Sequence, residues 1–155
     1  MYRFRGTYDY SIDDKGRVNI PAKFRKMLQP AADETFVITL APGKCLRAYP
    51  QDAWAPFEDE LHSRPETPDT LAYKRLVFNN VSDSQLDSQG RVLVPAEQLR
   101  LVEIRKNVVL SGQGDFIEIW DTDRFNATFR AVTTDQFDDL FFKSVQSSQS
   151  FKNGK

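Results

Sequence analysis

Residues 12–22, with the sequence IDDKGRVNIPA, recur further along the chain as residues 86–96, with the sequence LDSQGRVLVPA. Both copies keep an aspartate, a glycine, an arginine, a valine, a proline and an alanine at the same places. A repeat of this length identifies the unit from which a fold is built, because each copy specifies the same local structure. The chain is therefore an internal duplication that presents one surface twice.

The similarity between the copies extends well beyond these eleven residues. Each copy continues with an apolar run, a glycine-containing turn, an alternating strand and the start of a helix, at 36–40, 41–44, 45–49 and 52–54 in the first copy and 108–111, 112–115, 116–120 and 123–125 in the second. We therefore predict a first half at residues 1–78, a second half at 79–145 and a flexible Ser- and Gln-rich tail at 146–155. Halves of this size bury little apolar surface alone, so we expect them to share one core.

The repeated motif predicts a tight turn between two strands. Apolar and polar residues alternate over residues 8–12 and 17–20, which is the period of a half-buried strand. Asp13 and Asp87 can accept hydrogen bonds from the amides of their own turns, while Gly16 and Gly90 tolerate a positive φ. If Val18 faces the core, its neighbours face outward, and the turn becomes a sharp β-hairpin with a cationic tip.

Helices are expected after each strand pair. Pro21 and Pro95 suit the first turn of short helices. Longer helices are predicted at 52–62, with Asp52 as N-cap, at 67–78, capped by Thr67, and at 123–131 and 134–143.

Positive charge is concentrated at the start of the chain, although the whole sequence has a net charge of −1. Residues 1–30 contain seven lysines and arginines against three aspartates, a balance of +4 that leaves the remainder at about −5. In residues 83–106, four cations are offset by four carboxylates. The two copies therefore share a backbone but differ in electrostatic role.

Several function classes lack support in the sequence. It contains no metal-ligand spacing, no catalytic constellation and no Gly-rich phosphate loop, so we expect no enzyme activity, no metal, no cofactor and no small-molecule substrate. Cys45 is expected to be a small core residue and His62 an exposed one. No apolar run is long enough to span a bilayer and no signal sequence is evident, so we expect a cytoplasmic protein without membrane association.

The duplicated motif, together with Phe4-Arg5-Gly6 near the start and aromatic helices after each strand pair, resembles the MraZ family of bacterial transcriptional regulators. The resemblance covers roughly residues 4–143. It implies an α+β fold in which tandem AbrB-like hairpin and helix halves pack as one pseudo-twofold, β-barrel-like domain with peripheral helices.

The resemblance also implies a function. Members of the family form closed rings of subunits, and we expect an octamer. They bind short direct repeats in the promoter of the bacterial division and cell-wall gene cluster and repress their own operon, which implies double-stranded promoter DNA as partner and association with the nucleoid. Carried over by position, the DNA-facing residues are Lys15 and Arg17, with Arg3 and Arg5 nearby as phosphate contacts.

Alternative interpretations stay open at this point. Lys15 and Arg17 could be solvated turn charges. Arg91, in a neutral setting, is favoured as the donor of a salt bridge within the chain or between subunits, and either aspartate could pair with an arginine of the other copy. Leu93, which replaces Asn19 at an outward position, is a candidate subunit contact. The competing function is an antitoxin-like or scaffold module that binds a protein and has weak, sequence-indifferent affinity for DNA.

Overall fold

The computed structural model describes the backbone of residues 1–153 and the side chains of residues 1–149. The chain separates into two compact units, Met1–Thr122 and the segment from Asp123 onward. Strands of both sequence copies lie inside the first unit.

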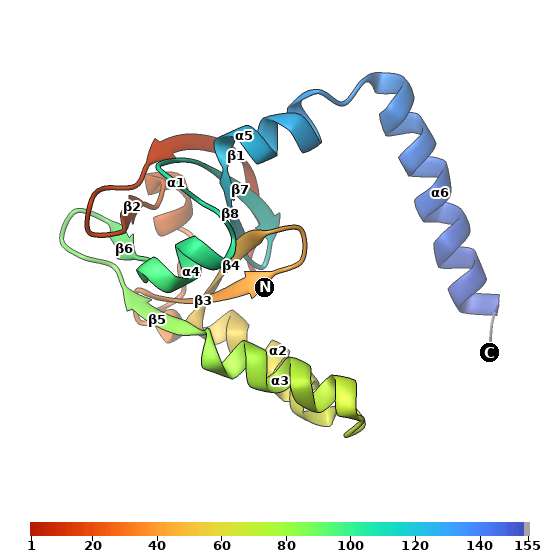
Figure 1. Cartoon of the computed structure of the whole chain (residues 1–155), viewed down its shortest axis with the longest axis horizontal. Helices are drawn as coiled ribbons and strands as arrows, with labels where there is room; N and C mark the ends of the chain where they lie inside the picture. The colour runs from red at the N-terminus through yellow and green to blue at the C-terminus, as the bar shows by residue number, and fades with distance from the viewer. Residues whose placement is uncertain (154–155) are drawn as a thin grey trace. The chain divides into compact units, whose positions relative to one another are not determined.

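The first unit is built on a six-stranded sheet in which every pairing is antiparallel (Figure 1). The strand order is β1-β7-β8-β4-β3-β5. The strands are β1 (Phe4–Ser11), β3 (Thr35–Ala41), β4 (Cys45–Pro50), β5 (Ser82–Gln85), β7 (Asn107–Gly114) and β8 (Ile117–Asp121). The sequence predicted all of these except β5.

The strand order reads the same from either end when each strand is replaced by its counterpart in the other copy. At the centre of the sheet, β4 pairs with β8, and Arg47 lies opposite Glu118. The Arg47 Nε lies 3.1 Å from a Glu118 carboxylate oxygen. Within residues 1–153, β1 and β5 each have one partner strand, so hydrogen bonds do not close this sheet on itself. The coarser expectation of a mixed α+β fold is confirmed.

The remaining two strands form a small sheet of their own, here called the β-ribbon, made of β2 (Arg17–Asn19) and β6 (Arg91–Leu93). Val18 lies opposite Val92 at its centre, and both are buried. The predicted hairpin is therefore wrong in one respect: the two strands that the first turn connects do not pair with each other. Strand β1 pairs with β7, and β2 pairs with β6 from the other copy. A turn fixes chain reversal locally, but the partner of each strand is selected by packing.

Both copies contribute to one core, as expected from their size. Its fully buried members come from both halves and include Phe4, Phe24, Leu46, Val92, Leu110 and Ile119. Cys45 is fully buried, as predicted. A second apolar cluster joins the sheet to the α2–α3 pair, with Tyr49, Trp54, Leu61 and Val77 as its main members.

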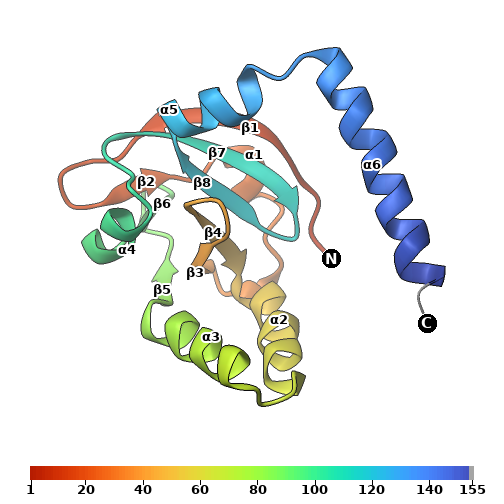
Figure 2. The ribbon, with the colours of Figure 1, turned by 45° about the vertical axis from the view of Figure 1, so that its right-hand side comes forward.

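Helices α2 and α3 follow the predictions with one correction. Helix α2 (Gln51–Ser63) and helix α3 (Pro68–Asn79) lie side by side at one end of the unit (Figure 2), where the His62 ring stacks on that of Phe78. Thr67 caps α3 as predicted, accepting a hydrogen bond from the Thr70 amide. Asp52 does not cap α2; it lies inside the first turn, and its carboxylate accepts a hydrogen bond from the Tyr2 hydroxyl.

Two short helices follow the β-ribbon strands, α1 (Ala22–Arg25) and α4 (Ala96–Leu101). At equivalent positions they bury different side chains. Phe24 packs edge-on against the rings of Phe4 and Tyr8. Gln98 instead donates from its amide nitrogen to the carbonyl oxygens of Ile38 and Asn80. A 3-10 turn, η1 (Pro30–Ala32), precedes β3.

The second unit is helical where it is described. Helix α5 (Thr122–Phe125) leads into a π-helical turn, η2 (Asn126–Arg130), and then α6 (Thr134–Asn153). The segment predicted to be a flexible tail therefore continues α6 as far as Asn153, and residues 154–155 lie outside the described residues. Its serines and glutamines do not prevent this, because none of residues 134–153 is a proline or a glycine. Large apolar side chains of α6 are exposed, among them Phe137, Leu140, Phe141 and Phe142.

The turn glycines lead to a test of the β-ribbon. Gly16 has a φ of +86°, and a Cβ there would lie 2.4 Å from the Val94 carbonyl oxygen, whereas Gly114, with a φ of +81°, has no atom within 4 Å of that position. A positive φ costs either alanine variant about 1–2 kcal/mol, and the clash adds about 1–3 kcal/mol at Gly16 alone. Urea unfolding should therefore show Gly16→Ala to be clearly less stable than Gly114→Ala. Equal losses of stability in the two variants would show that the backbone around Gly16 shifts to accommodate the added methyl group.

Candidate nucleic-acid interface

The first turn is closed by a set of hydrogen bonds centred on Asp13. Its carboxylate accepts from the backbone amides of Lys15, at 3.0 Å, and Arg17, at 2.9 Å. The same group accepts from the Arg17 Nε at 2.6 Å. The Gly16 amide donates to the Asp13 carbonyl, and the Asp13 amide donates to the Arg17 carbonyl. The aspartate thus holds both the backbone of the turn and its arginine side chain.

The second turn repeats this arrangement residue for residue. Asp87 accepts from the amides of Gln89 and Arg91, both at 2.9 Å, and from the Arg91 Nε at 2.8 Å. The Gly90 amide donates to the Asp87 carbonyl. Both aspartates therefore cap their own turns, as the motif predicted.

These contacts change the acidity of the two aspartates. The backbone hydrogen bond from Arg17 lowers the pKa of Asp13 below its ordinary value of 3.8, and the Arg17 guanidinium and Lys15 amide act in the same direction. The pKa of Asp87 is lowered in the same way, first by the Arg91 amide. Both turns are therefore built around a carboxylate that stays ionised.

The two turns are also joined to each other. The Gly16 carbonyl accepts from the Val94 amide, and the Gly90 carbonyl accepts from the Ile20 amide, so each turn continues one end of the β-ribbon. Across the ribbon, an Arg91 Nη1 lies 3.8 Å from an Asp13 carboxylate oxygen. Arg91 therefore forms salt bridges within the chain, to the aspartate of its own turn and to that of the other copy.

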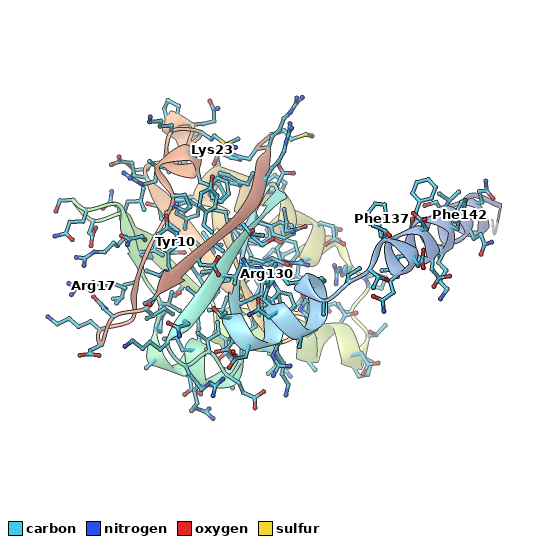
Figure 3. All side chains as sticks on the ribbon, turned by 90° about the horizontal axis from the view of Figure 1, so that it is seen from above. Tyr10, Arg17, Lys23, Arg130, Phe137 and Phe142 are labelled. Carbon is cyan, nitrogen blue, oxygen red and sulfur yellow. The ribbon has the colours of Figure 1, made fainter. Side chains whose placement is uncertain are left out.

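The tip of the first turn exposes two cationic side chains beside Asp13 and the exposed Asp14. Lys15 is exposed, and the Arg17 side chain is 35% exposed. Figure 3 shows Arg17 at the margin of the first unit. Asp13 holds the Nε of this guanidinium, and none of the hydrogen bonds described for the turn uses the edge formed by its two Nη atoms. Such an edge can donate two parallel hydrogen bonds to one acceptor group.

Arg3 and Arg5 are exposed but do not lie beside this turn, contrary to the prediction. They stand at the start of β1, whereas the turn follows its end at Ser11. Six steps of extended chain lead from Arg5 to Ser11, a distance on the order of 20 Å. Only Lys15 and Arg17 of the predicted set are brought together.

Arg25 is a basic residue at this surface that the sequence did not single out. It is exposed, lies on α1, and its Nε donates to the Ile20 carbonyl at 2.9 Å. Its position beside the second turn depends on packing between the copies, so the spacing of residues along the chain gave no signal.

Leu93, the candidate subunit contact, is 51% exposed and lies opposite Arg17 in the β-ribbon. Its amide donates to the Ser84 hydroxyl at 2.8 Å. The Leu93 side chain is therefore an exposed apolar group beside the first turn, where another molecule could contact it.

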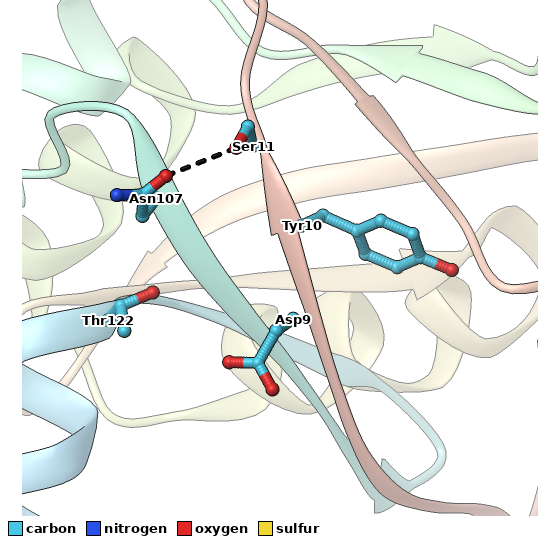
Figure 4. Close-up of a pocket in the computed structure, with 5 residues that line it drawn as sticks. All are labelled: Asp9, Tyr10, Ser11, Asn107 and Thr122. Carbon is cyan, nitrogen blue, oxygen red and sulfur yellow. Dashed lines mark hydrogen bonds between the residues drawn. The ribbon is translucent and has the colours of Figure 1, made fainter.

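A polar pocket of about 490 Å³ lies along β1 and β7, lined by Asp9, Tyr10, Ser11, Asn107 and Thr122 (Figure 4). The Ser11 hydroxyl donates to the Asn107 side-chain oxygen at 3.1 Å. The lining also holds the hydroxyl groups of Tyr10 and Thr122 and the Asp9 carboxylate. The part of the chain that the structure describes also holds no group of histidines, cysteines and carboxylates able to bind a metal.

A family model described as "MraZ protein, putative antitoxin-like" matches residues 3–75 and 77–143. The chain belongs to the MraZ family. Each matched range contains one copy of the duplicated turn, which agrees with the resemblance seen in the sequence.

Members of the family from several bacteria are similar to most of this chain. A protein of Nitrosomonas europaea named transcriptional regulator MraZ is 39% identical over 132 residues, 84% of this chain and 89% of that protein. Proteins with the same name from Moorella thermoacetica and Oenococcus oeni are 39% and 37% identical, covering 92% and 88% of this chain and 96% and 93% of their own lengths. Among the described residues, no helix is both long and apolar enough to cross a membrane.

The lowered pKa values predict how stability depends on pH. A carboxyl group whose pKa is lower in the folded state stabilises the fold fully above its ordinary pKa, and this stabilisation is lost as the pH falls through the folded value. The free energy of unfolding should therefore decline between about pH 5 and about pH 2. The double variant Asp13→Asn, Asp87→Asn should be less stable near pH 7 and should decline less steeply.

Urea unfolding across this pH range measures both effects. Asp14→Asn is the control, because Asp14 is exposed and its carboxylate accepts none of the turn hydrogen bonds described above. It should follow the wild type. A double variant with the wild-type slope would contradict the role of the two carboxylates.

Proposed function

We propose that this protein is a transcriptional regulator that binds promoter DNA through the β-ribbon and its turns. The observation that carries the proposal is the geometry of the first turn, where Asp13 holds the Arg17 Nε and the arginine side chain remains 35% exposed. Named relatives covering most of the chain support the same role. We also propose that the protein acts by binding and not as an enzyme. Its location is proposed to be the cytoplasm, at the nucleoid.

The chemistry of the turn suits the reading of guanine. In the major groove, guanine presents two acceptors, O6 and N7, that match the paired donors of an arginine, and such a contact is worth about 1–3 kcal/mol of discrimination. Holding the guanidinium on Asp13 fixes its direction before DNA arrives, which reduces the side-chain entropy lost on binding. Lys15, an exposed and flexible ammonium, suits a phosphate.

The first test compares Arg17→Ala with the wild type by gel shift on the promoter of the protein's own operon, which we propose as its target. Loss of the arginine should weaken specific binding by about 5- to 150-fold for each engaged protomer, and the preference for guanine at one position should relax. Size-exclusion chromatography and circular dichroism report whether the variant is folded and assembled.

Arg64→Ala provides the matched control for that experiment. Arg64 also bonds a carboxylate through its Nε, that of Glu60, but it lies at the end of α2. Its loss should leave specific binding unchanged. Sequence-specific binding that survives Arg17→Ala would place the site elsewhere, and a copurifying protein with sequence-indifferent DNA binding would favour the antitoxin-like or scaffold function.

We propose further that the two copies are related by a pseudo-twofold axis through the Val18–Val92 pair and that protomers assemble into a ring, with eight as the expected number. The register supports the axis, because Arg17 pairs with Leu93 and Asn19 with Arg91, each pair being the counterpart of the other. A ring presents many identical turns, and binding a second repeat then becomes intramolecular, which raises affinity by about 10²–10⁴-fold. Short direct repeats in the promoter of the division and cell-wall gene cluster, with repression of the operon, fit such an assembly.

Exposed apolar side chains supply candidate contacts for the ring. Leu93 is 51% exposed, and on α6 Phe137 and Phe142 are 65% and 63% exposed. Figure 3 shows these two rings projecting from their helix. Contiguous exposed apolar side chains often mark sites of contact with other proteins.

The variant Leu93→Asp tests the subunit contact. An aspartate buried between protomers would cost several kcal/mol without a partner, so the protein should run as a smaller species in analytical ultracentrifugation while keeping its secondary structure. Leu101→Asp, at a 38% exposed residue at the end of α4, serves as the control and should keep the assembly. If the Leu93→Asp variant still forms the ring, Leu93 is not part of the subunit interface.

A further inference from the structure

Arg25 belongs to the first copy of the motif but lies on the second turn. A methyl group built on Gly90 would stand 2.7 Å from the Arg25 Cζ and 2.8 Å from its Nη1, so the guanidinium rests against the glycine of that turn. Its Nε donates to the Ile20 carbonyl, which fixes the side chain along the end of the β-ribbon. The residue remains exposed to solvent.

This placement alters the charge of the second turn. The counterpart of Lys15 there is Gln89, which is neutral, and Arg91 is held by two aspartates. The second turn therefore lacks a counterpart of Lys15, and also of Asp14, which is replaced by Ser88. Arg25 adds a cation to it from outside the turn.

The spacing of the two turns matches a feature of DNA. Gly16 and Ile20 stand at the two ends of the β-ribbon, where each bonds the opposite strand. Four steps of extended chain between them amount to about 13 Å. The major groove of B-form DNA is about 12 Å wide. A ribbon that faces the groove would thus bring one turn near each of its two phosphate backbones.

We propose that the second turn is a second DNA-contacting element, in which Arg25 binds the phosphate backbone opposite the one that Lys15 binds. This inference rests on the proposed function and extends it. Each protomer would then contact the phosphate backbones at both edges of the groove, with Arg17 between them facing the bases. Because the two edges are held by different residues, one protomer would bind its DNA element in a single orientation.

Loss of the cation tests the proposal first. Arg25→Gln should weaken binding to every DNA sequence by a similar factor, several-fold, without changing base preference, and the slope of log K against log salt concentration should fall by about one per engaged protomer. Arg75→Gln on α3 removes the same charge far from the turns (Figure 1) and should leave the slope unchanged. Arg25→Lys should keep most of the affinity. Equal slopes for Arg25→Gln and Arg75→Gln would overturn the proposal.

A gain of charge tests it in a way that misfolding cannot imitate. Gln89→Lys gives the second turn the residue found in the first and should strengthen binding and steepen the salt dependence, whereas Ala72→Lys, an added charge at an exposed position of α3, should do neither. If Arg17→Ala abolishes specific binding while the Gln89 and Arg25 variants behave as their controls, the second turn makes no contact and the proposed function stands. If Arg17→Ala also binds specifically, the proposed function fails, and this inference fails with it.

Discussion

The pairing of β2 with β6 is the constraint on which the first unit depends. Each strand of this pair follows a turn that has just brought the chain out of the six-stranded sheet, so the ribbon can form only between the copies. Val18 and Val92 meet at its centre and are buried in the shared core. The same pairing places the two Asp-Arg turns at the two ends of one ladder and sets the distance between them. Fold, core and candidate site are therefore consequences of one contact between residues that are 74 positions apart.

Local structure followed from local sequence to a large extent. Alternating or continuous apolar runs located β3, β4, β7 and β8, and capping residues located α3, because these signals act between neighbours along the chain. Strand β5 was missed because its sequence, Ser-Asp-Ser-Gln, has no apolar alternation; it is a strand because β3 supplies its partner. The pairing of β1 with β7 could not be predicted either, because the partner strand is distant in the sequence. A turn sequence specifies that the chain reverses, but it does not specify which strand accepts the hydrogen bonds.

The candidate site divides along the same line. The motif itself predicted that both aspartates cap their turns, since every group involved lies within five residues. The side-chain bond from Arg91 to Asp13 was left as one of two possibilities, and it needed the structure to decide. The expected nearness of Arg3 and Arg5 to Lys15 failed because closeness in sequence was taken for closeness in space across an extended strand. Arg25 was missed for the converse reason, because it reaches a turn 65 residues away from it in sequence.

The pair Phe24 and Gln98 shows what linking two copies in one polypeptide permits. A phenyl ring fills its place in α1, whereas its mate in α4 holds two backbone carbonyls through an amide. An assembly of two identical short chains would have to carry the same side chain at both places, and one of the two surroundings would then suit it poorly. Covalent fusion frees each half to specialise, so that symmetry of the backbone coexists with individuality of the side chains.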